Sequence, residues 1–206
     1  IIVTDLPGIY SLSPYTLEEV VSRDYLLKEK PDVIIDLVDA TNIERNLYLA
    51  TQLLEIGIPV VIALNMVDLL KKNNIHINVK GLSSALGCPI VETSALKGTG
   101  LKEVVDEAIK CANQHRVPSK QMEFPKAVEK AVNEIEGFVP ANIAEENKRW
   151  YAVKLLERDS KVKEGLNLPA SAQSRIEEIA SGLEKAEDDD TESIVTDGRY
   201  QYIQKV

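Results

Sequence analysis

Two polar residues that follow an apolar run could read a purine base. Asn65 and Asp68 come directly after the run VVIAL at 60–64. Open parallel sheets bind ligands at the carboxyl ends of their strands. A carboxylate there accepts two hydrogen bonds from guanine, and adenine offers no such pair of donors. Asp68 would therefore select guanine, and Asn65 would tie the neighbouring loops and touch the base. The competing interpretation is that both residues only cap a helix after the strand.

A second group of candidate residues follows the next expected strand. Ser94, Ala95 and Leu96 stand after a short apolar segment at 89–91, within the run Thr93-Ser94-Ala95-Leu96-Lys97. The backbone N–H of Ala95 could donate to the carbonyl oxygen of guanine. The run is short enough to occur by chance, but it lies one strand and one helix after Asn65-x-x-Asp68. That order is the one a guanine pocket requires.

A third group lies near the start of the chain. Asp5, Leu6, Pro7 and Gly8 end a short apolar segment at 1–4. In P-loop nucleotide hydrolases an Asp at a strand end holds Mg²⁺, often through water. A Gly nearby lets its backbone N–H approach a terminal phosphate. An ordinary strand-to-turn transition would use the same residue types, so the order of the three groups carries the inference.

The elements that would position these residues alternate between strand and helix. We expect strands at 1–4, 33–38, 59–64 and 89–91, and helices at 17–28, 42–56, 79–86 and 101–114. Two capping boxes, Thr16 to Glu19 and Thr41 to Glu44, predict the starts of the first two helices. The β-branched run 33–38 is typical of a strand covered on both faces. Alternation of this kind predicts an α/β fold with a mostly parallel sheet.

The composition changes after residue 115 or so. Residues 1–115 form the expected α/β domain, 116–125 a linker, and 126–206 a small all-α domain. Its helices are expected at 127–138, 148–157, 161–164, 170–186 and 193–204. Asp188, Asp189 and Asp190 read as a solvated acidic loop, and Trp150 reads as an anchor of helical packing.

Charge and cysteine content exclude several classes of protein. The 206 residues carry a net charge of −9, which disfavours binding to nucleic acid. Cys88 and Cys111 have no metal-ligand spacing, and Cys88 reads as a core residue. His76 and His115 are also isolated, so the sequence shows no iron ligands. No apolar run reaches the length needed to cross a bilayer. We therefore expect this stretch to be soluble and in a reducing compartment.

These motifs support a resemblance to a known family. Asp-x-x-Gly, Asn-x-x-Asp and Ser-Ala resemble the third, fourth and fifth motifs of the translation-factor-related GTPases. Longer stretches resemble FeoB, the bacterial ferrous iron transport protein B: DLPGIYSLSPYTLEE at 5–19, DLVDATNIERNLYL at 36–49 and, more loosely, RWYAVKLLE at 149–157 and DGRY at 197–200. The resemblance implies a GTPase-like domain and a helical domain at the cytoplasmic face of the bacterial inner membrane. Implied partners are GTP or GDP, Mg²⁺ at Asp5 and the transporter's own transmembrane permease. Homo-oligomerisation is left open.

The chain departs from the pattern of that family in three places. There is no GxxxxGK[ST] loop, whose backbone and Lys grip the phosphates. Met66 stands where Asn-Lys-x-Asp has Lys, so we expect weaker affinity for nucleotide at the pocket that includes Met66. Ile9 follows Gly8 where Ras-like enzymes place a water-orienting Gln, which leaves the catalytic residues unassigned.

The fold expected from the resemblance is a P-loop GTPase-like sheet, incomplete because its first strands are missing, followed by the helical domain. The strand missing from mid-sheet would leave a gap or force re-pairing. We expect residues 1–206 alone to be inactive in GTP hydrolysis. Two other functions remain open: a non-catalytic module that binds a partner or restrains nucleotide release, and a ribosome-assembly GTPase, against which the acidic helical tail argues.

Overall fold

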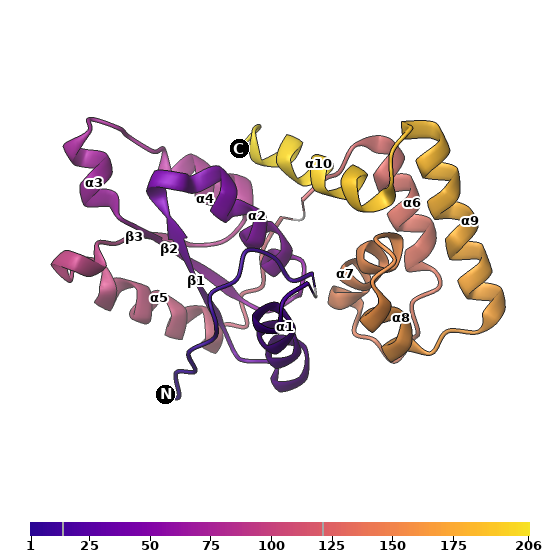
Figure 1. Cartoon of the computed structure of the whole chain (residues 1–206). Helices are drawn as coiled ribbons and strands as arrows, with labels where there is room; N and C mark the ends of the chain where they lie inside the picture. The colour runs from indigo at the N-terminus through magenta and orange to yellow at the C-terminus, as the bar shows by residue number, and fades with distance from the viewer. Residues whose placement is uncertain (14, 121) are drawn as a thin grey trace. The chain divides into compact units, whose positions relative to one another are not determined.

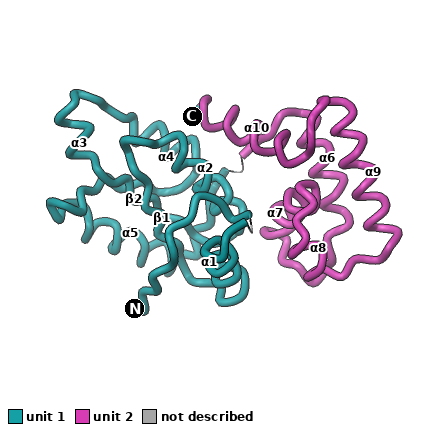
Figure 2. The backbone as a smooth tube through the Cα atoms, in the orientation of Figure 1, with its two compact units in different colours: residues 1–121, 206 teal, residues 122–205 magenta. Residues whose placement is uncertain are grey.

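The computed structural model describes residues 1–13, 15–120 and 122–206 of the chain. It divides into two compact units, residues 1–121 with Val206 and residues 122–205 (Figure 2). Pro14, part of the stretch at 5–19, and Gln121, part of the expected linker, lie outside the described residues. Each unit has its own core, and each is described by itself below.

The first unit is built on a parallel three-stranded sheet in the order β1-β2-β3. The strands are β1 (Ile34–Asp39), β2 (Val60–Asn65) and β3 (Ile90–Glu92). In the register, Ile34 pairs with Val60 and Ile62 pairs with Ile90. Residues 60–64 of the central strand are all at most 1% exposed, which fits an uninterrupted apolar run between two neighbours. The expected α/β class with a parallel sheet is confirmed.

Helices cover both faces of this sheet. Figure 1 shows α2 and α4 on one side of the strands and α5 on the other. On the α5 side, Val61 packs with Ala108 and Cys111. The helices of the unit are α1 (Leu17–Glu29), α2 (Ile43–Leu54), α3 (Val67–Lys72), α4 (Val79–Leu86) and α5 (Leu101–Asn113), with 3-10 turns η1 (Ala40–Asn42) and η2 (Ala95–Lys97).

One of the two expected capping boxes forms. The Thr16 side chain accepts from the N–H of Glu19, and the Glu19 carboxylate accepts from the N–H of Thr16. The prediction of a capping box from Thr41 to Glu44 is wrong. There the Asp39 carboxylate accepts from both the backbone N–H and the hydroxyl of Thr41, at 2.8 and 2.7 Å. The nearer carboxylate takes the Thr41 donors and produces the η1 turn before α2.

The strand expected at residues 1–4 does not form in the described structure. Ile1, Ile2 and Val3 are 94%, 94% and 83% exposed, and residues 1–4 join no described strand in a sheet. An extended segment becomes a strand only when a neighbour satisfies its backbone groups. In the described residues β1 is the edge strand on that side, and residues 1–4 do not re-pair with it.

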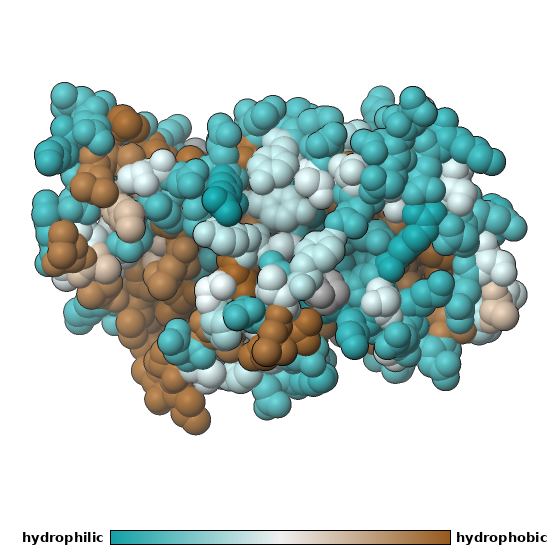
Figure 3. Space-filling view, in the orientation of Figure 1, coloured by the Kyte–Doolittle hydropathy of each residue, from teal (hydrophilic) through white to brown (hydrophobic). Residues whose placement is uncertain are grey.

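The expectation that β1 is covered on both faces is also wrong. Its side chains alternate, with Ile34 and Val38 buried and Ile35 and Leu37 39% and 71% exposed. The register places Ile35 and Leu37 on the same face as Val61, where α5 packs mainly over β2. Figure 3 shows hydrophobic side chains gathered on the side of this unit where the N-terminus lies.

The second unit consists of helices α6 (Lys126–Glu136), α7 (Glu145–Leu156), α8 (Ser160–Leu166), α9 (Ala170–Glu187) and α10 (Thr191–Ile203). The expected all-α composition is therefore confirmed. Trp150 is 1% exposed and meets Tyr151 edge to face with ring centroids 5.0 Å apart, as expected for an anchor of helical packing. Asp190 of the acidic loop caps α10 by accepting from the N–H of Ser193 at 2.9 Å.

Two charged clusters hold the second unit together. Arg149 binds both carboxylate oxygens of Glu129 and the carbonyl of Met122. The Arg158 cluster consists of Arg158, which lies at φ 58°, with Glu177 and Glu184. The second unit begins at Met122, inside the segment 116–125 that was expected to be a linker. The bond from Arg149 to the Met122 carbonyl attaches this residue to α7. In the described part of the chain no helix is both long and apolar enough to cross a membrane.

Candidate functional site

The loops that follow β2 and β3 are joined through Asn65. Its Oδ1 accepts from the backbone N–H of Ala95 at 3.0 Å and lies 3.4 Å from the Thr93 hydroxyl. Val67 N–H also donates to the carbonyl of Thr93 at 3.3 Å. Asn65 therefore reaches a neighbouring loop, as expected, and makes no capping bond to α3. The Ala95 N–H, expected to face guanine, is here bonded to Asn65.

The carboxylate of Asp68 lies in the first turn of α3. Its side chain is 14% exposed, and its Oδ2 lies 3.8 Å from the ammonium of Lys97 on the η2 turn. A cation at that distance offsets the cost of keeping a carboxylate largely out of water. The pattern of residues did not single out Lys97 as a partner of Asp68, because a lysine at a turn is usually only a solvated charge.

Met66 connects the end of β2 to α3 with a left-handed backbone at φ 65°, and its side chain is 40% exposed. A non-glycine residue in this region is uncommon and costs on the order of 1 kcal/mol. Such strain is held in place by surrounding bonds, here those of Asn65 and Val67 to the loop after β3. The turn directs Asp68 and the exposed Met66 to the same end of the sheet.

Ser94 and Leu96 occupy opposite environments in the η2 loop. Ser94 is 1% exposed, and its hydroxyl has no hydrogen-bond partner among the described residues. A buried polar atom left unpaired costs about 1–3 kcal/mol and calls for an explanation such as an absent ligand or water. Leu96 is 91% exposed, so its apolar side chain is available to a ligand.

Gly100 fixes the end of this loop, and the motifs in the sequence did not single it out. It lies at φ 77°, and a Cβ placed on it would be 2.1 Å from the carbonyl oxygen of Glu92 at the end of β3. Ser94 and Thr99 close the intervening turn through hydrogen bonds in both directions. The pattern Gly98-x-Gly100 in the sequence was the available indication of a tight turn here.

The segment Asp5-Leu6-Pro7-Gly8 lies apart from these loops in sequence and is mostly exposed. The hydroxyl of Ser22 donates to the carbonyl of Pro7 at 3.3 Å, and nothing lies within 4 Å of the position of a Cβ at Gly8. A carboxylate on an open segment suits Mg²⁺, which binds through one or two carboxylates, waters and phosphates rather than a protein cage. Asp5 therefore fits one ligand of a nucleotide-bound Mg²⁺.

Asp36 is the most perturbed carboxylate of the first unit. It is 7% exposed, and burial raises its pKa to about 7. Its Oδ2 has no hydrogen-bond partner among the described residues. The register pairs Asp36 with Ile62, so it lies on the face opposite Val61 and α5.

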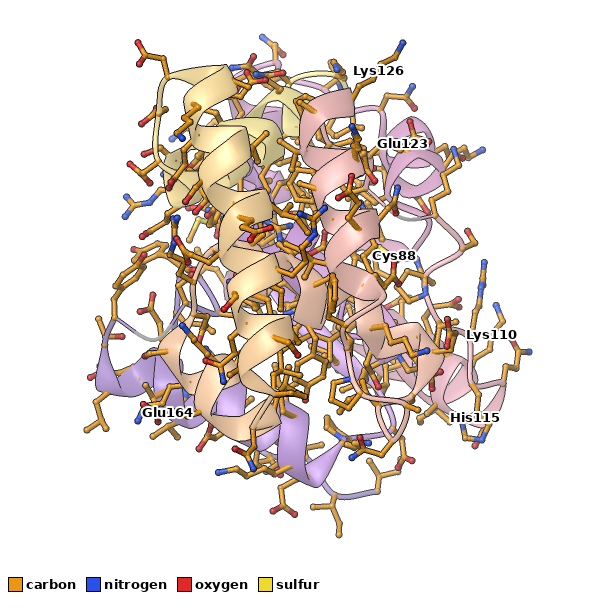
Figure 4. The ribbon with its side chains drawn as sticks, turned by 90° about the vertical axis from the view of Figure 1, so that its right-hand side faces the viewer. Cys88, Lys110, His115, Glu123, Lys126 and Glu164 are labelled. Atoms are coloured by element: carbon orange, nitrogen blue, oxygen red, sulfur yellow. The ribbon has the colours of Figure 1, made fainter. Side chains whose placement is uncertain are left out.

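No iron site is visible in the described part of the chain, where no group of three His, Cys, Asp or Glu residues could hold a metal ion. Burial raises the pKa of the Cys88 thiol to about 12, with a further contribution from the nearby charge of Asp36. A thiol held protonated is a poor metal ligand. Figure 4 shows Cys88 and His115 well separated. Cys88 is thus a core residue, as its sequence context predicts.

Comparison with known proteins identifies the family from both units. The family model described as "Ferrous iron transport protein B" matches residues 1–108, and the model of the FeoB cytosolic helical domain matches residues 124–206. The chain belongs to the FeoB family. This membership removes the alternative of a ribosome-assembly GTPase.

Among curated proteins, the chain is 35% identical to the Fe(2+) transporter FeoB of Escherichia coli K12 over 208 residues, covering 97% of this chain and 26% of that protein. It is 38% identical to the Fe(2+) transport protein A/Fe(2+) transporter FeoB fusion protein of Porphyromonas gingivalis, covering 98% and 25%. The chain therefore spans about a quarter of the length of these curated relatives.

Among solved structures, the chain resembles NFeoB from S. thermophilus at 45% identity. The form bound to GDP.AlF4- and K+ superposes with a TM-score of 0.92, covering 98% of this chain and 78% of that chain. The form bound to mGMPPNP gives a TM-score of 0.88, with coverage of 98% and 76%. These matches confirm the expected GTPase-like fold followed by a helical domain.

Proposed function

We propose that this chain is the guanine-nucleotide-responsive part of a ferrous iron transporter. The observation that carries the proposal is the bond from Ala95 N–H to Asn65 Oδ1, which joins the two loops expected to form the base pocket. Its family supports the nucleotide class, since the related NFeoB structures hold guanine nucleotides. Family membership supports attachment to a transmembrane permease at the cytoplasmic face of the inner membrane.

The base would be read from the loops after β2 and β3. Asp68 would accept from the ring N–H and the exocyclic amino group of guanine, after its carboxylate leaves Lys97. The Ala95 N–H would shift part of its bond from Asn65 to the guanine carbonyl. The exposed side chains of Met66 and Leu96 would lie against the apolar faces of the base.

The phosphate side would be sensed by the segment Asp5-Leu6-Pro7-Gly8. Asp5 would hold Mg²⁺ through water, and the N–H of Gly8 would approach the terminal phosphate because no side chain stands in its way. Bound Mg²⁺ would neutralise the charge that develops on the phosphates during hydrolysis. The segment would order on the triphosphate and be released after hydrolysis.

The specificity of the pocket is tested by calorimetric titration of GTP, GDP and ATP into a longer version of the protein that is extended upstream of residue 1. We expect binding of guanine nucleotides and no detectable binding of ATP. Asp68→Asn should weaken GTP binding by about 100-fold, since it removes a charged acceptor of two hydrogen bonds. Asp106→Asn, on an exposed part of α5, is the matched control. ATP binding as tight as GTP binding would contradict the assignment.

Hydrolysis is a separate question, because residues 1–206 contain no GxxxxGK[ST] loop. We expect negligible GTP turnover by these residues alone and measurable turnover by a version extended upstream that includes such a loop. Turnover by residues 1–206 would contradict the first expectation. If the extended version also bound no nucleotide, the alternative of a non-catalytic module that contacts a partner would take its place.

A further inference from the structure

The segment that follows Gly8 is held by helix α2, about 40 residues further along the chain. Gln52 Oε1 accepts from the backbone N–H of Leu12 at 2.6 Å. The Ser11 hydroxyl lies 3.3 Å from Gln52 Nε2 and 3.4 Å from Gln52 Oε1, within hydrogen-bonding range of both. The guanidinium of Arg45 lies over the ring of Tyr10, 4.1 Å from its centre. Figure 1 shows the early part of the chain running beside α2.

These contacts come from one face of α2. Arg45 and Gln52 are seven residues apart, which is two turns of the helix and places both side chains on the same side. Gln52 and Leu12 are each 0% exposed. A buried amide is retained where it satisfies a backbone group that would otherwise be unpaired, and the Leu12 N–H is such a group. Gln52 is therefore matched to this one conformation of the segment.

The bond network extends one step beyond Gln52. The Ser11 oxygen also accepts from the N–H of Ser13 at 3.0 Å. Ser11 is thereby bonded on one side to α2 and on the other to its own segment. Residues 11–13, named here the α2-bound segment, are consequently fixed by a buried side chain rather than by a strand or helix of their own.

The residues before this segment are held differently. Residues 5, 7 and 8 are exposed, and the described contacts of residues 4–8 are with α1: Ser22 with the Pro7 carbonyl at 3.3 Å and Tyr25 with the Thr4 hydroxyl at 3.0 Å. The Tyr25 bond is open to water and the Ser22 bond is only partly buried, whereas the Leu12 bond is fully buried, and hydrogen bonds that water can replace are lost at less cost than buried ones. The chain therefore changes from loosely to firmly held between Gly8 and Leu12.

We propose that Gln52 is a positioning residue that fixes the end of the phosphate-sensing loop, so that movement of Asp5-to-Gly8 stops at Leu12. This inference rests on the proposed function, because it gives Gly8 its place relative to a terminal phosphate. Gln52 touches no nucleotide in this scheme. It acts through Leu12 and Ser11, and it sets how far the Gly8 N–H lies from its target.

The first test measures hydrogen exchange of backbone amides in the 206-residue chain. Gln52→Met keeps length and helix propensity but leaves the Leu12 N–H without its acceptor. Exchange at Leu12 should accelerate roughly 10-fold, while the buried amides of β2 keep their wild-type rates. Asn46→Ala is the matched control, because among the described residues the Asn46 amide bonds only to the Asn42 carbonyl at the start of its own helix. Unchanged exchange at Leu12 would overturn the proposal.

A second variant covers the case in which Gln52→Met fails to fold. Ser11→Ala removes the partly buried contacts with Gln52 at 3.3 and 3.4 Å and the bond from the Ser13 N–H at 3.0 Å, and it keeps the Leu12 bond. Exchange at Leu12 should then rise by about 3-fold, less than for Gln52→Met. An effect spread equally over β2 would mean general destabilisation and would also count against the proposal.

The second test separates positioning from a purely structural role. In the upstream-extended protein, affinities for GDP and for a non-hydrolysable triphosphate are measured for the wild type and Gln52→Met. We expect the triphosphate affinity to fall about 10-fold and the GDP affinity to stay unchanged, since GDP has no terminal phosphate for Gly8 to meet. Equal losses for both nucleotides would overturn positioning. Absence of any guanine-nucleotide binding in the wild type would refute the proposed function. The hydrogen-exchange test would still decide whether Gln52 holds the Leu12 N–H.

Discussion

Replacing the buried Asp36 with asparagine should stabilise the first unit in a way that depends on pH. Asp36 is 7% exposed, and burial raises its pKa from 3.8 to about 7. The folded state thus binds this proton more tightly than the unfolded state does. The contribution of Asp36 to the free energy of unfolding is therefore most favourable below pH 4. It becomes less favourable as the pH rises toward 7 and is constant above that.

The size of the effect follows from the same two values. A shift of about 3 units at 1.36 kcal/mol per unit corresponds to a cost of about 4 kcal/mol at pH 8. At pH 4.5, where Asp36 is ionised mainly in the unfolded state, the same linkage gives a cost of about 1 kcal/mol. Asp36→Asn removes the charge at both pH values, so its stabilising effect should be about 3 kcal/mol larger at pH 8. Any cost of burying an unpaired amide is the same at both pH values and cancels in this comparison.

The assay is urea denaturation at pH 4.5 and 8 followed by far-ultraviolet circular dichroism. The only tryptophan of the chain, Trp150, lies in the second unit, so its fluorescence reports a transition that Asp36→Asn should not move. Asp32→Asn, at an exposed position just before β1, is the matched control. A stabilisation by Asp36→Asn that is equal at the two pH values would refute the reasoning.

Two further substitutions test the geometry of the loop and of the second unit. Gly100→Ala should destabilise the first unit by about 2–4 kcal/mol in thermal denaturation, because the new Cβ would fall 2.1 Å from the Glu92 carbonyl oxygen. A Cβ at Gly98 would meet nothing within 4 Å, so Gly98→Ala should cost only about 1 kcal/mol, for its left-handed backbone. In the second unit, Arg158→Ala should lower stability by about 1 kcal/mol. Arg158 lowers the pKa of both glutamates in its cluster, so this loss, followed by Trp150 fluorescence, should be present at pH 7 and shrink as the pH falls below about 4. Equal costs for the two glycine variants, or an Arg158→Ala effect that grows at low pH, would contradict these assignments.

Elements whose formation depends on local sequence were predicted well. The central strand β2 formed where an uninterrupted apolar run stands, and α1 began at the capping box of Thr16. The strand expected at 1–4 failed because pairing depends on a neighbour that no local pattern reveals. The box at Thr41 failed because Asp39, two residues earlier, competes for the same donors. In both cases the deciding group lies outside the motif.

The candidate site divides in the same way. A link from Asn65 to a neighbouring loop could be predicted, since both loops follow adjacent parallel strands and their order along the chain indicates a shared edge. The donor, Ala95 N–H, was expected to face guanine instead. The bond between Gln52 and Leu12 could not, because a glutamine in the middle of a helix carries no spacing rule that connects it to a residue 40 positions away. Its burial becomes visible only in the folded structure.

The two halves of the site are consequently held by different means. The proposed base half is built by bonds between the loops of neighbouring strands, such as that of Asn65 to Ala95. The phosphate half, at Asp5 to Gly8, depends on side chains of α1 and on the fixed point at Leu12. A rigid base pocket can keep its preference for guanine while the other half moves. In the proposed function, recognition of the base and sensing of the terminal phosphate are therefore separable, which is what a protein that must stay bound to one nucleotide class while changing state requires.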